Sequence, residues 1–162
     1  MPRTEYFESH ALPREEERPD IGIEAEKLYG LLLRADPMMN ATDRRRYNDG
    51  AIILIREVIG AFVLAYDFPE ERMKYLKILW AKIAVFIRHM RCIGETDAIR
   101  IQPKYETMTP DQMKLALMHH MARMEEGAAR WKRSLTQKGT RARPASQDGT
   151  GSIPRNEGDP TP

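Results

Sequence analysis

Asp67-Phe68-Pro69-Glu70-Glu71 is the stretch that decides the fold of this chain. Its proline disfavours helical backbone at Phe68 but suits the first turn of a helix that follows. The two glutamates favour the positive end of that second helix. One helix is therefore expected to end near Asp67 and another to begin at once. A connection this short places the two helices antiparallel.

The segments on both sides of this turn have helical periodicity. Upstream, the apolar residues recur at every third or fourth position, as Tyr47, Ala51, Leu54, Ile55, Val58, Phe62 and Tyr66. Downstream, one helical face carries Leu76, Leu79, Ile83, Phe86, Ile87 and Met90. Thr42 or Asp43 is expected to cap the first helix, and Gly94 to stop the second after about Ile93.

Two further helices are expected. Residues 21–35 have an apolar stripe, formed by Ile23, Leu28, Leu31 and Leu32, and Asp36-Pro37 ends it. Near the other end, Met108-Thr-Pro-Asp-Gln112 predicts a helix start, with Thr109 as the cap and Pro110 as the first helical residue. That helix has on one face Met113, Leu117, Met121, Met124, Ala128, Trp131 and Leu135.

The sequence thus predicts an all-α protein, an antiparallel up-down four-helix bundle over residues 21–136. A long loop, 94–107, joins the last two helices, and its alternating Ile99 and Ile101 predict a short extended piece. The first 20 residues are acidic, with three basic and six acidic side chains, and contain three prolines. They predict a disordered arm, and the Gly-, Pro- and Ser-rich residues 137–162 predict a disordered tail.

Composition favours a cytoplasmic protein without a membrane span. The single cysteine, Cys92, excludes an intrachain disulfide. The acidic amino terminus has no apolar run and does not resemble a signal peptide. The most apolar stretch, 50–66, is short for a span and has Arg56 and Glu57 near its middle, which indicates a buried helix.

The helix after the turn is strongly basic. Between Glu71 and Glu95 it carries six cations and no acid: Arg72, Lys74, Lys77, Lys82, Arg88 and Arg91. At 100° per residue, four of them fall within about a third of the helix circumference, with Ala81 and Ala84 between them. Such a strip attracts polyanions and predicts nucleic-acid contact. The alternatives are an ordinary solvated face and a contact with an acidic protein.

A second basic stretch lies between Glu126 and Asp148. Arg130, Lys132 and Arg133 belong to the last predicted helix, and Lys138, Arg141 and Arg143 follow. These residues predict further phosphate contacts. A solubilising tail that complements the helix dipole is an equal alternative.

The helix before the turn is apolar nearly all round. Ile53 and Leu64 project away from its main stripe, and Gly60 and Ala61 would let another helix approach closely. A helix of this kind is central or part of an interface, so we predict a homo-oligomer. The alternative is that the arm or the long loop covers these side chains.

No catalytic, metal or cofactor site is recognisable. His119 and His120 are adjacent on a helix, where they are expected not to share one face. No metal-ligand spacing or phosphate-binding glycine loop occurs. The Arg-to-His spacing of helical ribonucleases occurs only at Arg3 and His10, in the predicted arm, which argues against an RNA-cleaving toxin.

Several of these segments together carry a family resemblance. They are Phe68-Pro69, Ile87-Arg-His-Met-Arg91-Cys-Ile93, Met108–Gln112 and Trp131-Lys-Arg-Ser-Leu135. Over roughly residues 24–135 the chain resembles the accessory variability determinant of diversity-generating retroelements. That protein belongs to a four-helix bundle family also encoded in ribosomal RNA intervening sequences.

The resemblance implies a non-enzymatic pentamer that binds RNA or DNA and partners a reverse transcriptase. Arg91 matches a basic position of the family best, and Arg88 lies one turn away. The acidic arm, the long loop and the tail depart from the family pattern. The leading hypothesis is therefore a nucleic-acid-binding accessory subunit, and the alternative is a four-helix protein–protein scaffold without a nucleic-acid role.

Overall fold

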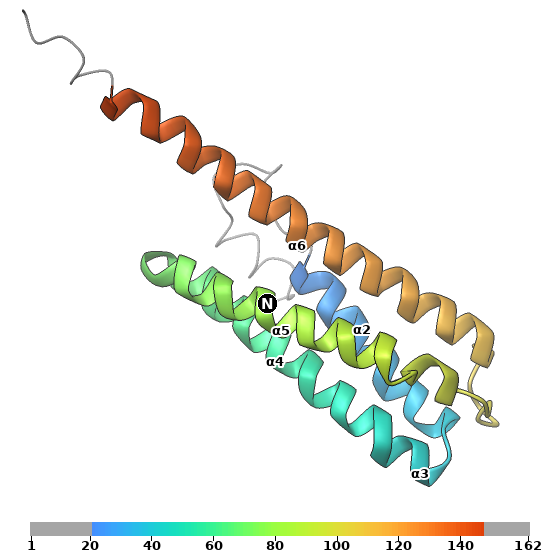
Figure 1. Ribbon diagram of the computed structural model, residues 1–162. Coiled ribbons are helices and arrows are strands. Elements are labelled where there is room, and N and C mark those ends of the chain that lie inside the picture. Colours follow the sequence, from blue (N-terminus) through green and yellow to red (C-terminus); the bar gives the residue numbers. More distant parts are fainter. Residues whose placement is uncertain (1–20, 148–162) are drawn as a thin grey trace, which may run out of the picture.

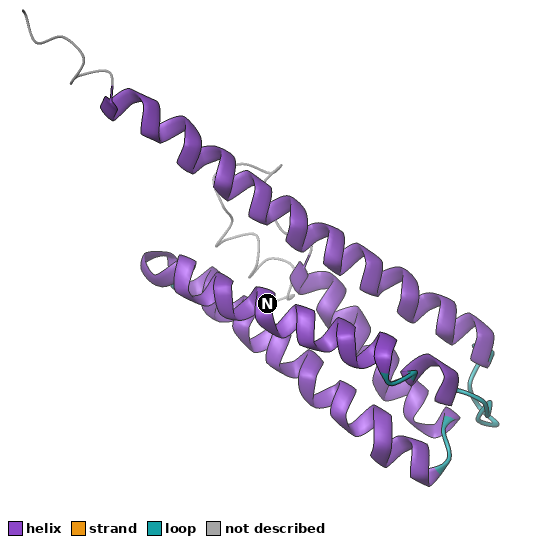
Figure 2. Cartoon of the chain, viewed as in Figure 1, coloured by secondary structure: helices purple, strands orange, loops and turns teal. Residues whose placement is uncertain are grey.

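The computed structural model describes the backbone of residues 21–147 and the side chains of residues 21–136. The described chain is all-helical and has no strand (Figures 1 and 2). Its four long helices are α2 (Ile21–Ala35), α4 (Asp49–Asp67), α5 (Arg72–Cys92) and α6 (Pro110–Gln147). The predicted all-helical bundle is thereby confirmed. The predicted disordered arm, and the predicted tail beyond residue 147, lie outside the described residues.

The turn between α4 and α5 has its proline at the position predicted from the sequence. Phe68 follows the last residue of α4, and Pro69 opens a single 3-10 turn, η4 (Pro69–Glu71), that leads into α5. At the far end of α5, Gly94 has a φ of 74°, in the left-handed region that favours glycine. A 3-10 helix, η5 (Glu95–Ala98), follows that glycine.

The entry into α4 differs from the prediction. Asn40, rather than Thr42 or Asp43, caps a short helix, α3 (Ala41–Asp43), by accepting a hydrogen bond from the Asp43 amide at 2.8 Å. Asparagine is as good a helix cap as aspartate. The helical segment therefore begins before the apolar stripe from which its start was predicted. A π-helical turn, η3 (Arg44–Asn48), then joins α3 to α4.

The buried side chain of Asn48 ties this turn to the end of α2. Its amide nitrogen donates to the carbonyl oxygen of Leu32 at 3.1 Å and to Oδ1 of Asp36 at 2.9 Å. The turn thus satisfies a carbonyl at the end of α2, where intrahelical donors run out.

The start of α6 is a capping box. The Thr109 amide donates to Oε1 of Gln112, and the Gln112 amide donates to Oγ1 of Thr109. The helical backbone of α6 continues to Gln147, past the bundle boundary predicted at residue 136.

The helices pack in the order α6–α2–α4–α5, because α2 contacts both α6 and α4, and α4 contacts α5. By contrast, α5 and α6 make few backbone approaches to each other. All six predicted apolar residues of α5 are buried. Ile23 is an exception to the predicted stripe of α2: it is exposed, while Ile21 and Ala25 are buried in its place.

The loop before α6 is hydrogen-bonded to η2 (Asp36–Met38), the 3-10 helix that follows α2. The amides of Arg100 and Ile101 both donate to the carbonyl oxygen of Met38. Ile99, next to them, has extended backbone and is buried, whereas Ile101 is exposed. An exposed ion pair of 2.6 Å also joins Arg34 to Glu106, and its hydrogen bond lowers the pKa of Glu106.

No helix in the described part of the chain is long and apolar enough to cross a membrane.

Candidate nucleic-acid interface

An exposed basic strip runs along α5, formed by Lys74, Lys77, Arg88 and Arg91. Exposed Ala81 and Ala84 lie between the two pairs of cations, and α5 contains no acidic residue. Arg91 forms an ion pair of 2.9 Å with Glu125 of α6. The strip therefore borders the side of α5 that faces α6.

Two of the predicted phosphate-binding residues have other partners. Nε of Arg72 donates to the carbonyl oxygen of Ala65 at 3.0 Å, so this side chain satisfies the carboxyl end of α4. Nζ of Lys82 lies 3.1 Å from Oε2 of Glu57 on α4. Lys82 thus faces α4, on the other side of α5 from the strip. The helical spacing placed both cations on α5 but did not show which neighbour each would meet.

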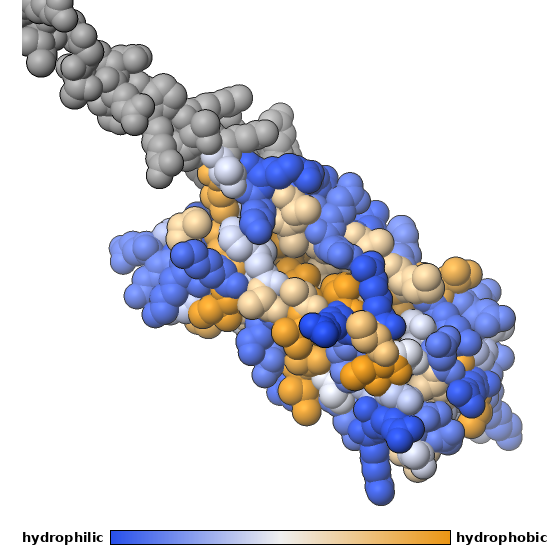
Figure 3. Space-filling model, viewed as in Figure 1, coloured by the Kyte–Doolittle hydropathy of each residue, from blue (hydrophilic) through white to orange (hydrophobic). Residues whose placement is uncertain are grey.

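A groove of about 430 Å³ lies between α5 and α6, beside the strip. Charged side chains at its edges are Arg88, Arg91, Lys132 and Glu125, and Cys92 lies at one end. Its floor and walls are apolar: Trp80, Ile83, Ala84, Ile87, Ala128 and Ala129. Figure 3 shows hydrophobic surface along this seam, with hydrophilic side chains on either side of it.

Lys132 connects the two walls of the groove. Its ammonium nitrogen lies 5.4 Å from the centre of the Trp80 ring, which is a cation–π contact between α6 and α5. Arg130 and Arg133, predicted beside it, are also exposed on α6 but do not line the groove. Lys138, Arg141 and Arg143 belong to the helical residues whose side chains the structure does not describe. The groove therefore brings together Arg88, Arg91 and Lys132 from the predicted set.

The residues predicted to form an oligomer surface are partly exposed. Ile53 is 58% exposed and Leu64 39% exposed on α4, and Gly60 is exposed between them. Ala61 is only 6% exposed, because it lies on the inner face of α4, so its assignment to this surface was wrong. Exposed Ile78 and Val85 lie on the adjacent helix α5.

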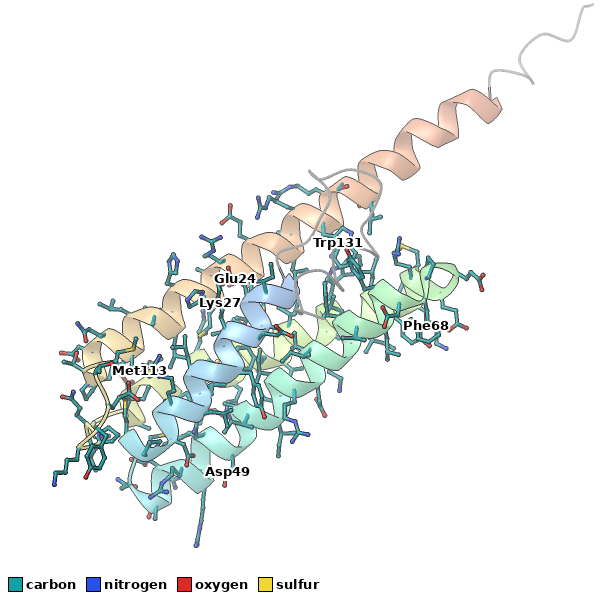
Figure 4. The ribbon with its side chains drawn as sticks, turned by 180° about the vertical axis from the view of Figure 1, so that it is seen from behind. Glu24, Lys27, Asp49, Phe68, Met113 and Trp131 are labelled. Atoms are coloured by element: carbon teal, nitrogen blue, oxygen red, sulfur yellow. The ribbon has the colours of Figure 1, made fainter. Side chains whose placement is uncertain are left out.

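A polar cluster that the sequence analysis missed joins α2 to α6. Glu24 of α2 is 1% exposed, and its carboxylate contacts Nδ1 of His120 and Nε of Arg123. Figure 4 shows Glu24 and Lys27 on the side of α2 that lies along α6. The ring centroids of His119 and His120 are 5.1 Å apart, although side chains at adjacent helical positions were expected not to share one face. The sequence signal that could have revealed this cluster is an acidic residue on the buried face of the helix at residues 21–35.

A second buried carboxyl, Glu95, lies where α5 ends. Neither of its oxygens has a hydrogen-bond partner among the described residues, and the nearest nitrogen of His89 is 3.7 Å away. That nitrogen lies 2.8 Å from the carbonyl oxygen of Tyr47. Burial, and then the charges of Asp49, Asp36 and Asp43, raise the pKa of Glu95 to about 8. The group is therefore mostly protonated at neutral pH.

Among residues 21–136, no group of three or more His, Cys, Asp or Glu side chains could hold a metal ion. Comparison with known proteins found no matching family model, no matching curated protein and no matching solved structure. The basic strip and the groove beside it are the features of the described residues that suit binding of a partner.

Proposed function

We propose that this protein is a non-enzymatic nucleic-acid-binding subunit that binds RNA or DNA through α5. The observation that supports this function is the exposed strip of Lys74, Lys77 and Arg88, on a helix without a single acidic residue. Lys132 adds positive charge on the α6 side of the groove, while Arg91 is paired with Glu125. Adjacent cations that are not neutralised by acids attract a phosphate backbone.

Binding of this kind is led by phosphates and depends steeply on salt. Phosphate contacts position a protein on nucleic acid but do not read its sequence. The charged side chains of the strip are lysines and arginines, exposed on one face of α5. The proposed affinity is therefore weakly dependent on sequence.

The family resemblance supplies the proposed protein partner, a reverse transcriptase with its template RNA in a diversity-generating retroelement. In that setting the protein would hold RNA and polymerase together rather than perform chemistry. The exposed apolar residues of α4, Ile53 and Leu64, support a homo-oligomer, for which the resemblance suggests five copies. The alternative function, a protein–protein scaffold, would use the same apolar surface without RNA.

The test is a charge reversal along the strip. The variant Lys77→Glu, Arg88→Glu, Arg91→Glu should lose most of its affinity for RNA in low salt, measured by fluorescence anisotropy. A matched variant reverses three exposed cations elsewhere, with Arg45→Glu, Arg46→Glu and Lys104→Glu. It carries the same net charge and should retain more affinity.

Circular dichroism and light scattering should show unchanged helix content and mass in both variants. Equal RNA affinity in the two variants would refute the role of α5, because net charge alone would then explain binding. Binding of the unmodified protein to heparin and RNA that is no stronger than that of a neutral helical control would favour the scaffold.

A further inference from the structure

We propose that the groove between α5 and α6 binds the bases of single-stranded nucleic acid, while the cations at its edges hold the phosphates. This inference rests on the proposed function and narrows it, because it names single strands as the substrate class. It also gives the groove and the strip different tasks within one binding surface.

The apolar floor is the first observation. Phosphates need only exposed cations, and these are already present on the outer face of α5. The groove adds a surface of a different kind, with Ile83 and Ile87 below and Ala84 and Ala129 at the walls. Base faces are flat and less polar than phosphates. Proteins that bind single strands without sequence preference combine a positively charged groove with aromatic side chains on which bases stack. Here the apolar floor adjoins one such side chain, Trp80.

The charge on both edges is the second observation. Arg88 and Arg91 stand on the α5 edge, and Lys132 stands on the α6 edge. The acidic residue at the groove, Glu125, is paired with Arg91, so it does not oppose a phosphate near Arg88 or Lys132. A strand lying along the seam would thus meet cations from both helices.

The dimensions of the groove agree with this occupant. Its volume of about 430 Å³ lies within the range of roughly 300–1,000 Å³ typical of small-ligand sites. Along α5 it extends from Trp80 to Cys92, which is about 18 Å at 1.5 Å per residue. A short run of nucleotides fits this length, whereas the paired and stacked bases of a duplex would present only their backbone.

Trp80 provides an aromatic wall at the other end from Cys92. The Lys132 ammonium group lies over this ring, and Lys132 is itself exposed. Movement of this one lysine side chain would open the indole to a base and bring the ammonium group toward the adjacent phosphate. Stacking on aromatic side chains is tolerant of sequence, because every base has a π-face.

The experiment compares three fluorescent probes on the full-length protein in low salt. They are a short single strand, an abasic strand with the same number of phosphates, and a duplex of the same sequence. The strand with bases should bind about tenfold more tightly than the abasic strand, the contribution expected from a stacked base. It should also bind more tightly than the duplex.

Two substitutions fill the groove without changing charge, Ala84→Leu on α5 and Ala129→Leu on α6. Each has a matched control on the same helix, Ala81→Leu and Ala122→Leu, at exposed alanines that do not line the groove. Each groove variant should lose the roughly tenfold advantage of the strand with bases while binding the abasic strand as before. Each control variant should keep that advantage, and circular dichroism should show all four variants folded.

Two outcomes overturn the inference and leave the proposed function standing. One is equal affinity for the strands with and without bases. The other is full retention of the base-dependent affinity in Ala84→Leu and Ala129→Leu, which would leave the groove to a different occupant, such as a helix of a protein partner. If none of the three probes binds, the proposed function fails and the inference fails with it.

Discussion

The carboxylate of Glu24 on α2 lies 2.5 Å from Nδ1 of His120, which comes 96 residues later on α6. The same carboxylate accepts a hydrogen bond of 2.9 Å from Nε of Arg123, one turn further along α6. The Lys27 ammonium group lies 3.9 Å away on α2 itself. This cluster therefore fixes which face of α6 meets α2.

Substitution of Glu24 by glutamine should destabilise the bundle. It removes the charged acceptor of Arg123 and His120, and hydrogen bonds to charged groups contribute about 1.5–3 kcal/mol each. Because Arg123 and His120 retain access to water, we expect a loss of about 1–3 kcal/mol in the free energy of unfolding, measured with urea. The exposed pair of Glu125 and Arg91 is the control, since Glu125→Gln should cost less than about 1 kcal/mol. Equal losses would contradict a special role for Glu24.

The pKa of Glu95 predicts that stability falls as the pH rises from about 4.5 to about 8. In this window the folded protein retains a proton that the unfolded chain has released, so the free energy of unfolding decreases with pH. At 1.36 kcal/mol for each pKa unit, the difference between the two pKa values corresponds to roughly 5 kcal/mol. His89, Asp36, Asp43 and Asp49 are the titratable groups that face this carboxyl.

The variant Glu95→Gln isolates the contribution of this carboxyl. Glutamine is neutral at every pH, so the variant should gain stability over the unmodified protein as the pH rises from 5 toward 8. Urea unfolding midpoints of both proteins across this range provide the measurement. A constant difference between the two proteins at all pH values would show that Glu95 does not hold a proton in the folded state.

The salt dependence of binding should report the number of phosphate contacts. The logarithm of the association constant for a single strand falls with the logarithm of salt concentration, with a slope of about −0.7 for each phosphate contact. Arg88→Gln should therefore flatten this slope by about 0.7. Arg45→Gln, at an exposed arginine outside the strip, should leave the slope unchanged. Titrations at several salt concentrations test both expectations.

An aspartate at Leu64 should reduce the mass of the proposed oligomer. Leu64 and Ile53 are exposed apolar side chains of α4, and a charge placed between two packed copies would be costly to bury. Light scattering on Leu64→Asp should give a lower mass than on the unmodified protein. Ile23→Asp is the matched control, because Ile23 is equally apolar and exposed but lies on α2. A monomeric unmodified protein would remove the oligomer from the proposed function.

Local chemistry predicted the helices well, because it acts over a few residues. The bounds 21–35, the turn at Phe68-Pro69, the Gly94 stop and the Thr109 cap all follow from side-chain and backbone effects within one helical turn. The π-helical turn at Arg44–Asn48 was not predictable in the same way. It is accompanied by contacts of Asn48 with Leu32 and Asp36, which are distant in sequence.

The candidate site was predictable only as a set of charges on one helix. Periodicity assigned Lys74, Lys77, Arg88 and Arg91 to a common face, and the structure exposes all four. It could not show that Lys82 would meet Glu57, or that α5 and α6 would leave a groove, since both depend on how separate helices are placed. The burial of Glu24 could not be predicted for the same reason.

Because α5 and α6 have few contacts with each other, α2 is the main link between α6 and the other long helices of the described bundle. Among the neighbouring long helices, α5 and α6 approach each other least, and they meet mainly through side chains such as Arg91 and Glu125. If α2 detaches, α6 loses its main attachment to the α4–α5 hairpin, whereas detachment of α6 leaves the other three helices in contact. The amide protons of α2 should therefore be no easier to exchange than those of α6, although α2, with 15 residues, is the shortest of the four.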